Sequence, residues 1–326
     1  MKRPLVTLTL VATALATAAT APPAAAVVAP APTYVIRPGA LERGANIKIA
    51  HLEGRTIVDG SIRVPLRGAH VSLIATSGAN YLVGTTNADF EAPKIWRVRP
   101  SGARTLILSG YSAFDAEVSD AGARLAVSRI VGKRSTVVEI DTASGAVLGR
   151  RTFRGFPTVL DVGGPRVVLG TWSKPRSFIW NTATGRTRTL LDRAGTFADL
   201  SSDQLAYFTK DPYRDGCQVL TRLSRPANRI WRSCTERVHT MNVDGSRMAT
   251  IDILSDGIGP NRVVLRRHTG ARLATYDTQG FFGEVQFEDR THLLLDTTGK
   301  KYAATVRCTP AGCERASRLR KAAFPR

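Results

Sequence analysis

The chain has 326 residues, a formal net charge of +20 and a pI near 10.7. A surface this basic attracts anionic polymers. The basic residues are scattered in ones and twos, however, and no nucleic-acid-reading motif is present, so nucleic acid is excluded as the expected partner.

The first 26 residues have the layout of a secretory signal peptide. Lys2 and Arg3 precede an apolar run that is too short to span a bilayer, and an Ala-x-Ala site ends at Ala26. We therefore expect cleavage there, with an uncleaved anchor as the alternative, and a secreted or cell-envelope location. The expected parts are a signal peptide (1–26), a flexible linker (27–33), a single β-propeller domain (34–319) and a basic tail (320–326).

A polar turn between two strand-like runs recurs along the mature chain. The turns are centred on Gly60, Gly102, Gly145, Gly185, Ala227, Gly270 and Gly312, with spacings of 42, 43, 40, 42, 43 and 42 residues. A second pair of apolar runs precedes each of the last six turns. Each repeat therefore predicts four short strands, and no helical apolar stripe interrupts the pattern.

These repeats predict an all-β fold, a β-propeller. A lone four-stranded sheet cannot hide two apolar faces, so the sheets must stack around an axis, and a period of 40 to 45 residues is typical of propeller blades. Six units run from about residue 70 to 319, and residues 34–66 form an irregular first one. We predict seven four-stranded blades with an irregular first blade; six blades are the alternative.

Two stretches resemble known propeller families. The run IWNTATG, Ile179 to Gly185, is similar to the third strand of a WD40 repeat, with Asn181 where that family usually has Asp. The run SDAGARLAVS, Ser119 to Ser128, resembles the first hairpin of TolB-like repeats. Because the Gly-His pair and the His-Asp network of WD40 blades are missing, the resemblance implies a divergent exported WD40/TolB-like propeller and carries over no catalytic residue.

Four cysteines in an exported chain predict disulfides. Cys217 and Cys234 lie nearly equidistant from one third-to-fourth-strand turn, and Cys308 and Cys313 flank another. The repeat therefore selects the pairs Cys217–Cys234 and Cys308–Cys313, each within one hairpin. The alternative, a metal site, lacks the usual zinc spacing. We expect no metal, no cofactor and no catalytic motif.

Acidic residues recur in or near the first strand of each blade, which should line a central channel. The candidate ligand residues there are His70, Asp115, Glu117, Asp161, Asp199, His239, Asp244 and Glu284. Converging carboxylates could bind a cation or act as an acid/base pair. The competing interpretation is that strand-end carboxylates accept backbone N–H bonds, and no spacing selects a pair.

Large apolar residues recur at the blade starts, at Phe114, Phe156, Phe197, Val238 and Phe281. We expect them to wedge between blades. Trp172 and Tyr213 fall in loops between second and third strands and complete the candidate ligand surface.

Together these features predict a non-catalytic exported binding or scaffold module for a protein or an anionic cell-envelope polymer. The alternative is a hydrolase or lyase that uses the channel carboxylates. Ligand identity and oligomeric state do not follow from the sequence.

Overall fold

The computed structural model describes residues 30–323, and residues 31–323 belong to one compact unit. The expected signal peptide and residues 27–29 of the expected linker lie outside the described residues. Within them the chain is almost entirely β-structure. Its helical content is limited to three short 3₁₀ turns, η1 (Pro38–Ala40), η2 (Ala113–Asp115) and η3 (Pro212–Arg214). No helix in this part of the chain has the length and apolar character to cross a bilayer.

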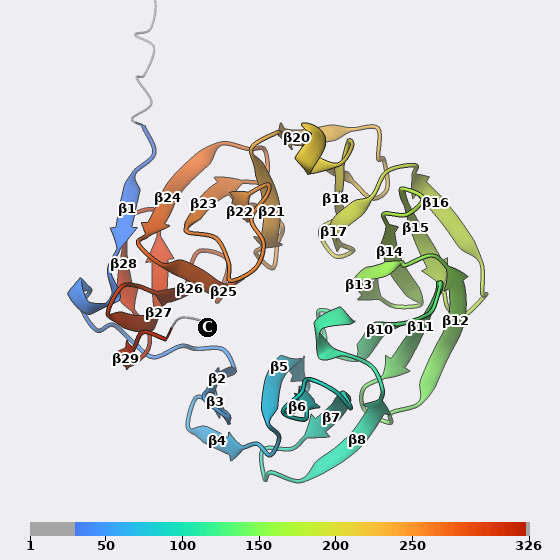
Figure 1. Ribbon diagram of the computed structural model, residues 1–326, viewed down its shortest axis with the longest axis horizontal. Coiled ribbons are helices and arrows are strands. Elements are labelled where there is room, and N and C mark those ends of the chain that lie inside the picture. The colour runs from blue at the N-terminus through green and yellow to red at the C-terminus, as the bar shows by residue number, and fades with distance from the viewer. Residues whose placement is uncertain (1–29, 324–326) are drawn as a thin grey trace, which may run out of the picture. The chain divides into compact units, whose positions relative to one another are not determined.

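Within this unit the strands form seven sheets arranged as blades in a ring, with the first strand of each complete blade innermost (Figure 1). Blade 1 has three strands, β2 (His51–Glu53), β3 (Thr56–Asp59) and β4 (Ile62–Pro65). Blade 2 has β5 (His70–Ser77), β6 (Asn80–Thr86), β7 (Lys94–Val98) and β8 (Arg104–Ser109). Blade 3 has β9 (Ala116–Val118), β10 (Arg124–Val131), β11 (Arg134–Asp141) and β12 (Val147–Arg154).

The remaining blades keep the same order of antiparallel strands. Blade 4 has β13 (Thr158–Gly163), β14 (Arg166–Thr171), β15 (Arg176–Asn181) and β16 (Thr187–Leu191). Blade 5 has β17 (Gly195–Asp199), β18 (Gln204–Phe208), β19 (Gln218–Arg222) and β20 (Arg229–Ser233). Blade 6 has β21 (Glu236–Met241), β22 (Arg247–Asp252), β23 (Arg262–Arg267) and β24 (Arg272–Thr278). Blade 7 has β25 (Phe281–Phe287), β26 (Leu293–Thr298), β27 (Tyr302–Thr309), β28 (Gly312–Arg315) and, against the start of β27, β29 (Arg320–Lys321).

The hydrophobic cores lie between neighbouring blades. Val159 and Trp180 of blade 4, for example, pack with Ala126 and Val137 of blade 3, and all four are buried. Equivalent clusters join the other neighbours. This arrangement confirms the physical basis of the seven-blade prediction, because each sheet buries its apolar faces only against the next sheet.

The first blade is irregular, as predicted, and lacks its innermost strand. The turn at Gly60 joins β3 to β4, so by the repeat spacing these are the third and fourth strands of the blade. The N-terminal segment passes along the last two blades before it reaches β2. Its strand β1 (Thr33–Ile36) pairs in parallel with β24, the outer strand of blade 6, and Arg43 then bridges to Arg315 of β28.

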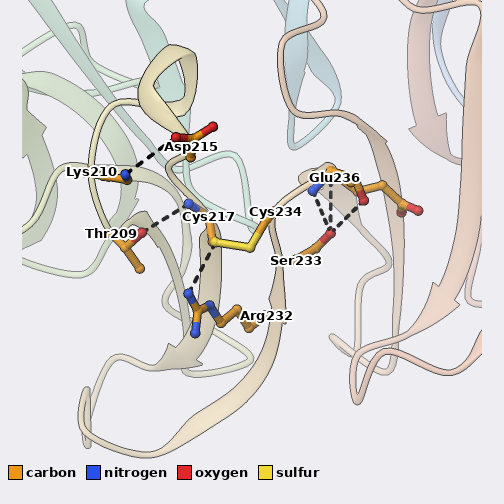
Figure 2. Close-up of a disulfide and its surroundings, with 9 residues drawn as sticks. Thr209, Lys210, Asp215, Cys217, Arg232, Ser233, Cys234 and Glu236 are labelled. Atoms are coloured by element: carbon orange, nitrogen blue, oxygen red, sulfur yellow. Dashed lines mark hydrogen bonds and ion pairs between the residues drawn. A yellow bond between two sulfur atoms is a disulfide. The ribbon is translucent and has the colours of Figure 1, made fainter.

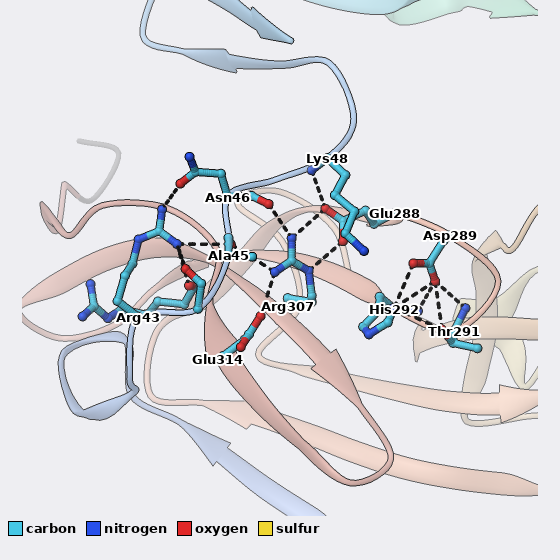
Figure 3. Close-up of polar contacts among 12 residues, drawn as sticks. Arg43, Ala45, Asn46, Lys48, Glu288, Asp289, Thr291, His292, Arg307 and Glu314 are labelled. Atoms are coloured by element: carbon cyan, nitrogen blue, oxygen red, sulfur yellow. Dashed lines mark hydrogen bonds and ion pairs between the residues drawn. The ribbon is translucent and has the colours of Figure 1, made fainter. Parts of the chain in front are cut away.

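A buried ion pair holds this N-terminal segment against blade 7 (Figure 3). The Arg307 guanidinium donates to both carboxylate oxygens of Glu288, at 2.6 and 2.8 Å. It also donates to the carbonyls of Ala45 (3.1 Å) and Asn46 (2.8 Å), while Glu288 accepts from the backbone N–H of Lys48 at 2.6 Å. Each buried charge therefore has partners, which is the condition under which a buried pair is tolerated.

Both predicted disulfides are present, and the described residues contain no free cysteine. Cys308 and Cys313 are directly paired across β27 and β28. Cys217 and Cys234 close the open end of the β19–β20 hairpin, where Cys217 N–H also donates to Thr209 Oγ1 at 3.0 Å (Figure 2). The staple thus fixes the base of the loop that carries Tyr213.

The alternating strand directions place two kinds of connection at the same end of the ring. These are the loops between second and third strands and the links from one blade to the next. We call this end the loop face. Cross-loop contacts confirm the grouping: Gly155 N–H, in the link to blade 4, donates to Lys133 O in the β10–β11 turn at 3.1 Å.

Candidate functional site

Two carboxylates lie side by side in the channel. Glu117 of β9 pairs in register with Ala126, and Asp161 of β13 pairs with Val168. Each partner is the third residue of its second strand, so the two acids occupy the same register position on neighbouring blades. Asp161 also accepts N–H bonds from Val162 (2.7 Å) and, across to blade 5, from Leu200 (2.5 Å).

The surroundings disfavour the charged forms of these two acids. Burial, together with the charge of Asp161, raises the pKa of Glu117 to about 8. Burial raises the pKa of Asp161 to about 7 despite the two N–H bonds that it accepts, and Asp199 and Asp120 add to the rise. The pair therefore holds a proton close to neutral pH, as a general acid must.

Two other predicted acids are turn residues. Asp199 Oδ1 accepts the N–H groups of Ser201 (2.9 Å) and Ser202 (3.0 Å). Asp244 accepts from Ser246 N–H at 3.0 Å and pairs with Arg290 at 3.4 Å. Both stabilise first-to-second-strand turns at the end opposite the loop face. Asp199 acts on Asp161 through its charge, but its own carboxylate is engaged in the turn.

The remaining predicted channel residues are dispersed. His239 is the extra residue of a β-bulge in β21, where burial and the nearby Arg237 lower its pKa to about 4. Glu284 lies in a bulge of β25 on blade 7, where burial and Asp296 raise its pKa. His70 stacks on Phe90 at 3.8 Å, and Asp115 is exposed at the end of η2. The predicted set thus yields one adjacent pair.

A cavity of about 850 Å³ lies at the seam where blade 7 meets blades 1 and 2. Glu284 and Asp296 line it together with His51, Arg318 and Arg320. Arg320 donates to Asp296 at 2.6 Å, so two of the charged side chains that line this cavity already form an ion pair with each other. The missing inner strand of blade 1 accounts for this space.

A second cavity, of about 910 Å³, lies on the loop face between blades 4, 5 and 6, and we call it the loop pocket. It brings together Trp172 and Tyr213, the two loop aromatics singled out in the sequence. Trp172 contacts Phe208 with ring centroids 5.5 Å apart. The residues lining the pocket also include Arg193, Ala194, Thr196, Thr209, Lys210, Asp211, Arg237, Ile253, Leu254 and Ser255.

Hydrogen bonds between loops hold the Tyr213 side of the pocket. Asp211 Oδ1 accepts Tyr213 N–H at 3.0 Å and so caps η3. Tyr213 Oη donates to Asp256 Oδ2 of the next blade at 3.0 Å, and this bond raises the pKa of the phenol. The disulfide at Cys217, shown in Figure 2, anchors the same loop. Together with the bonds of Asp211 and Asp256, it fixes this wall at three points.

Arg237 is the functional candidate that sequence reasoning missed. Its half-buried side chain lines the loop pocket and donates to the Ser255 carbonyl at 2.9 Å. Burial lowers its pKa, while the charges of Asp252 and Asp256 oppose that effect, and no ion pair within 4 Å neutralises it among the described residues. Its position at the start of a first strand, beside the predicted His239, was the available signal.

The predicted wedge residues divide into two groups. Val238 is buried and Phe197 packs against the same core between blades 5 and 6. Phe281 is partly buried. Phe114 and Phe156 are exposed on the loop face, so the wedge prediction is wrong for these two. Their links to the next blade carry them over the surface.

No group of three or more His, Cys, Asp or Glu suited to hold a metal occurs within residues 30–323. No protein-family model and no curated protein matches the sequence. The structure is similar to the acylaminoacyl peptidase of Pyrococcus horikoshii, with a TM-score of 0.57 at 13% identity over 81% of this chain and 48% of that one. It is also similar to an acylaminoacyl peptidase in complex with Z-Gly-Gly-Phe-chloromethyl ketone, with a TM-score of 0.54 at 10% identity over 84% and 52%.

TolB from Acinetobacter baumannii matches with a TM-score of 0.43 at 11% identity over 66% of this chain and 57% of that one. The chain spans about half the length of the two peptidases and somewhat more of TolB. Likeness at this level of identity concerns the fold alone. The protein is a seven-bladed β-propeller with an irregular first blade.

Proposed function

We propose that this protein is an extracytoplasmic binding module that takes an anionic ligand into the loop pocket without catalysing a reaction. The ligand is a segment of a protein or of an anionic cell-envelope polymer. The two disulfides are compatible with a location outside the cytoplasm.

The observation that carries the proposal is Arg237. A guanidinium has five N–H donors, and only the bond to Ser255 is made within the described chain. Because the pocket withdraws part of its hydration, an incoming carboxylate or phosphate would meet an under-solvated cation. The aromatic side chains of Trp172, Phe208 and Tyr213 offer apolar contact beside that anion-binding group.

Isothermal titration with defined probes tests this proposal. The probes are a tetragalacturonate, an oligomer of glycerol phosphate and a peptide with a free carboxyl end, with neutral tetragalactose and the amidated peptide as controls. We expect an anionic probe to bind and the neutral ones not to bind. Arg237→Met should weaken binding by at least about tenfold, since a charge-assisted hydrogen bond contributes roughly 1.5–3 kcal/mol. Arg237→Lys should restore part of it.

Arg188→Met, in the exposed part of β16 outside the pocket, is the matched control and should bind like the wild type. The proposal fails if charged and neutral probes bind equally, or if Arg237→Met and Arg188→Met behave alike.

A second candidate is a hydrolase or lyase, favoured by the raised pKa values of Glu117 and Asp161. An acid and a base with such values are suited to proton transfer near pH 7. It predicts turnover of polyuronate or of activated esters that Glu117→Gln and Asp161→Asn each abolish. Absence of turnover, or turnover that survives both changes, would remove this candidate.

A further inference from the structure

The β10–β11 turn of blade 3 projects two aliphatic side chains from the loop face. Ile130 is 58% exposed and Val131 is 62% exposed, and Gly132 completes the turn with φ +59°. Val131 pairs with Arg134 across the two strands, so the hairpin stays regular up to its tip. Aliphatic residues at the tip of a rigid hairpin gain no burial within the chain itself.

Two aromatic side chains extend this apolar surface. Phe114, in η2 beside β10, is 84% exposed, and Phe156, in the link to blade 4, is 42% exposed. The link contacts the turn through the bond from Gly155 N–H to Lys133 O. A Cβ at Gly155 would lie 2.9 Å from Ser173 Oγ, so the next loop also touches it. The four apolar residues therefore stand on connected segments of blades 3 and 4.

Six exposed cations stand on the same hairpin, link and loop as these apolar side chains. They are Arg129, Lys133, Arg134, Arg154, Lys174 and Arg176. Two of them, Arg129 and Arg176, also lie over the rings of Tyr111 and Phe178. No ion pair to a carboxylate is formed by any of the six within the described part of the chain. The nearest acid of this surface in sequence is Asp115, next to Phe114. We call Phe114, Ile130, Val131, Phe156 and these six cations the hairpin patch.

We propose that the hairpin patch docks this protein on an anionic lipid bilayer. Aromatic and aliphatic side chains can enter the region between headgroups and acyl chains, while the cations bind anionic headgroups around them. Lipid explains both halves of the patch. A hydrated polysaccharide would match the cations, but it offers no apolar phase for Ile130 and Val131.

The position of the patch also matches its proposed role. The turns between first and second strands and between third and fourth strands lie at the opposite end of the ring, so docking leaves that end free. The loop pocket opens on the docked face, and its Trp172 is two residues from Lys174 in the same loop. Docking itself does not depend on whether the pocket binds a ligand.

Vesicle co-sedimentation of the full chain tests the docking. We expect binding to vesicles with about 30% phosphatidylglycerol in phosphatidylcholine, weak binding to phosphatidylcholine alone, and a marked loss of binding between roughly 0.1 and 0.5 M salt. Lys133→Gln/Arg134→Gln should weaken binding by about tenfold or more at low salt. Ile130→Ser/Val131→Ser should weaken it by a similar factor and leave the salt dependence unchanged.

Matched control variants distinguish binding through the hairpin patch from binding that depends only on net charge or on exposed apolar area. Arg186→Gln/Arg188→Gln removes two exposed cations, and Val147→Ser/Leu148→Ser removes two exposed apolar residues of β12; both should bind like the wild type. All these positions are exposed, so circular dichroism should report unchanged folding. Equal binding of patch and control variants overturns the proposal, as does equal binding to neutral vesicles. Retention by a protein partner that persists without lipid and depends on Ile130 and Val131 also overturns it.

Discussion

Glu117 and Asp161 stand at equivalent register positions on the inner strands of adjacent blades, β9 and β13, and the charge of Asp161 adds to the effect of burial in raising the pKa of Glu117. Glu117 keeps contact with solvent in the channel, yet the surrounding strands replace most of its hydration. Two acids placed in this way are a cost to folding whenever both are ionised.

The first prediction concerns the pH dependence of stability. The folded chain holds a proton on Glu117 up to about pH 8, whereas an ordinary Glu loses it near 4.5. Below about pH 4.5 Glu117 is protonated in both the folded and the unfolded chain, so it does not disfavour folding. At higher pH the unfolded chain ionises first, and the free energy of unfolding falls until the pH has passed about 8. Glu117→Gln removes this loss. Between pH 5 and pH 8.5, urea unfolding should show the wild type losing roughly 1 kcal/mol relative to the variant, a modest value because channel water screens the charge. Parallel pH profiles would contradict this.

The second prediction concerns the ion pair that clamps the N-terminal segment. Arg307→Met leaves the Glu288 carboxylate buried without its main partner and leaves the carbonyls of Ala45 and Asn46 unsatisfied. We expect a loss of roughly 3–5 kcal/mol in the free energy of unfolding. Arg307→Met/Glu288→Leu should recover part of that loss, because no lone charge stays buried. Additive effects in this double-mutant cycle would refute the coupling.

Much of the fold could be predicted because the residues that specify each turn and strand of a blade lie within that blade's own stretch of sequence. Each turn needs Gly or a small polar residue, and each strand needs its own apolar residues, so the seven turns and the pairing of the cysteines could be read in order along the chain. For the same reason Trp172 and Tyr213 were placed in loops of adjacent blades, and the pocket that joins them follows from blade order.

The channel residues were harder to place, because register depends on bulges. β5, β13, β17 and β21 each carry an extra residue, at Ile74, Leu160, Thr196 and His239. One extra residue changes which side chains face the axis, and no local sequence signal marks it. The missing inner strand of blade 1 was equally hidden, since it depends on contacts such as Asn46 with Arg307, which are 261 residues apart.

The third prediction compares the two disulfides. Opening the Cys217–Cys234 loop should cost about 3 kcal/mol by loop-closure entropy, and opening the shorter Cys308–Cys313 loop should cost about 2. Chemical unfolding of Cys217→Ser/Cys234→Ser and Cys308→Ser/Cys313→Ser measures both. Only Cys217→Ser/Cys234→Ser should also weaken the binding of an anionic probe in the loop pocket, because the Cys217–Cys234 disulfide anchors the loop that carries Tyr213. Thiol titration of the unfolded, unreduced wild type should find no free sulfhydryl.

The last prediction uses two glycines in equivalent turns of neighbouring blades. Gly122, between β9 and β10, and Gly164, between β13 and β14, both have left-handed backbones, with φ +66° and +55°. A Cβ at Gly122 would lie 2.3 Å from Thr76 O of blade 2, whereas a Cβ at Gly164 meets nothing within 4 Å. Gly164→Ala should therefore cost about 1 kcal/mol, the strain of a left-handed residue. Gly122→Ala should cost at least about 2 kcal/mol more, because the backbones of two blades must separate. Equal losses in urea unfolding would mean that blades 2 and 3 do not approach so closely at this turn.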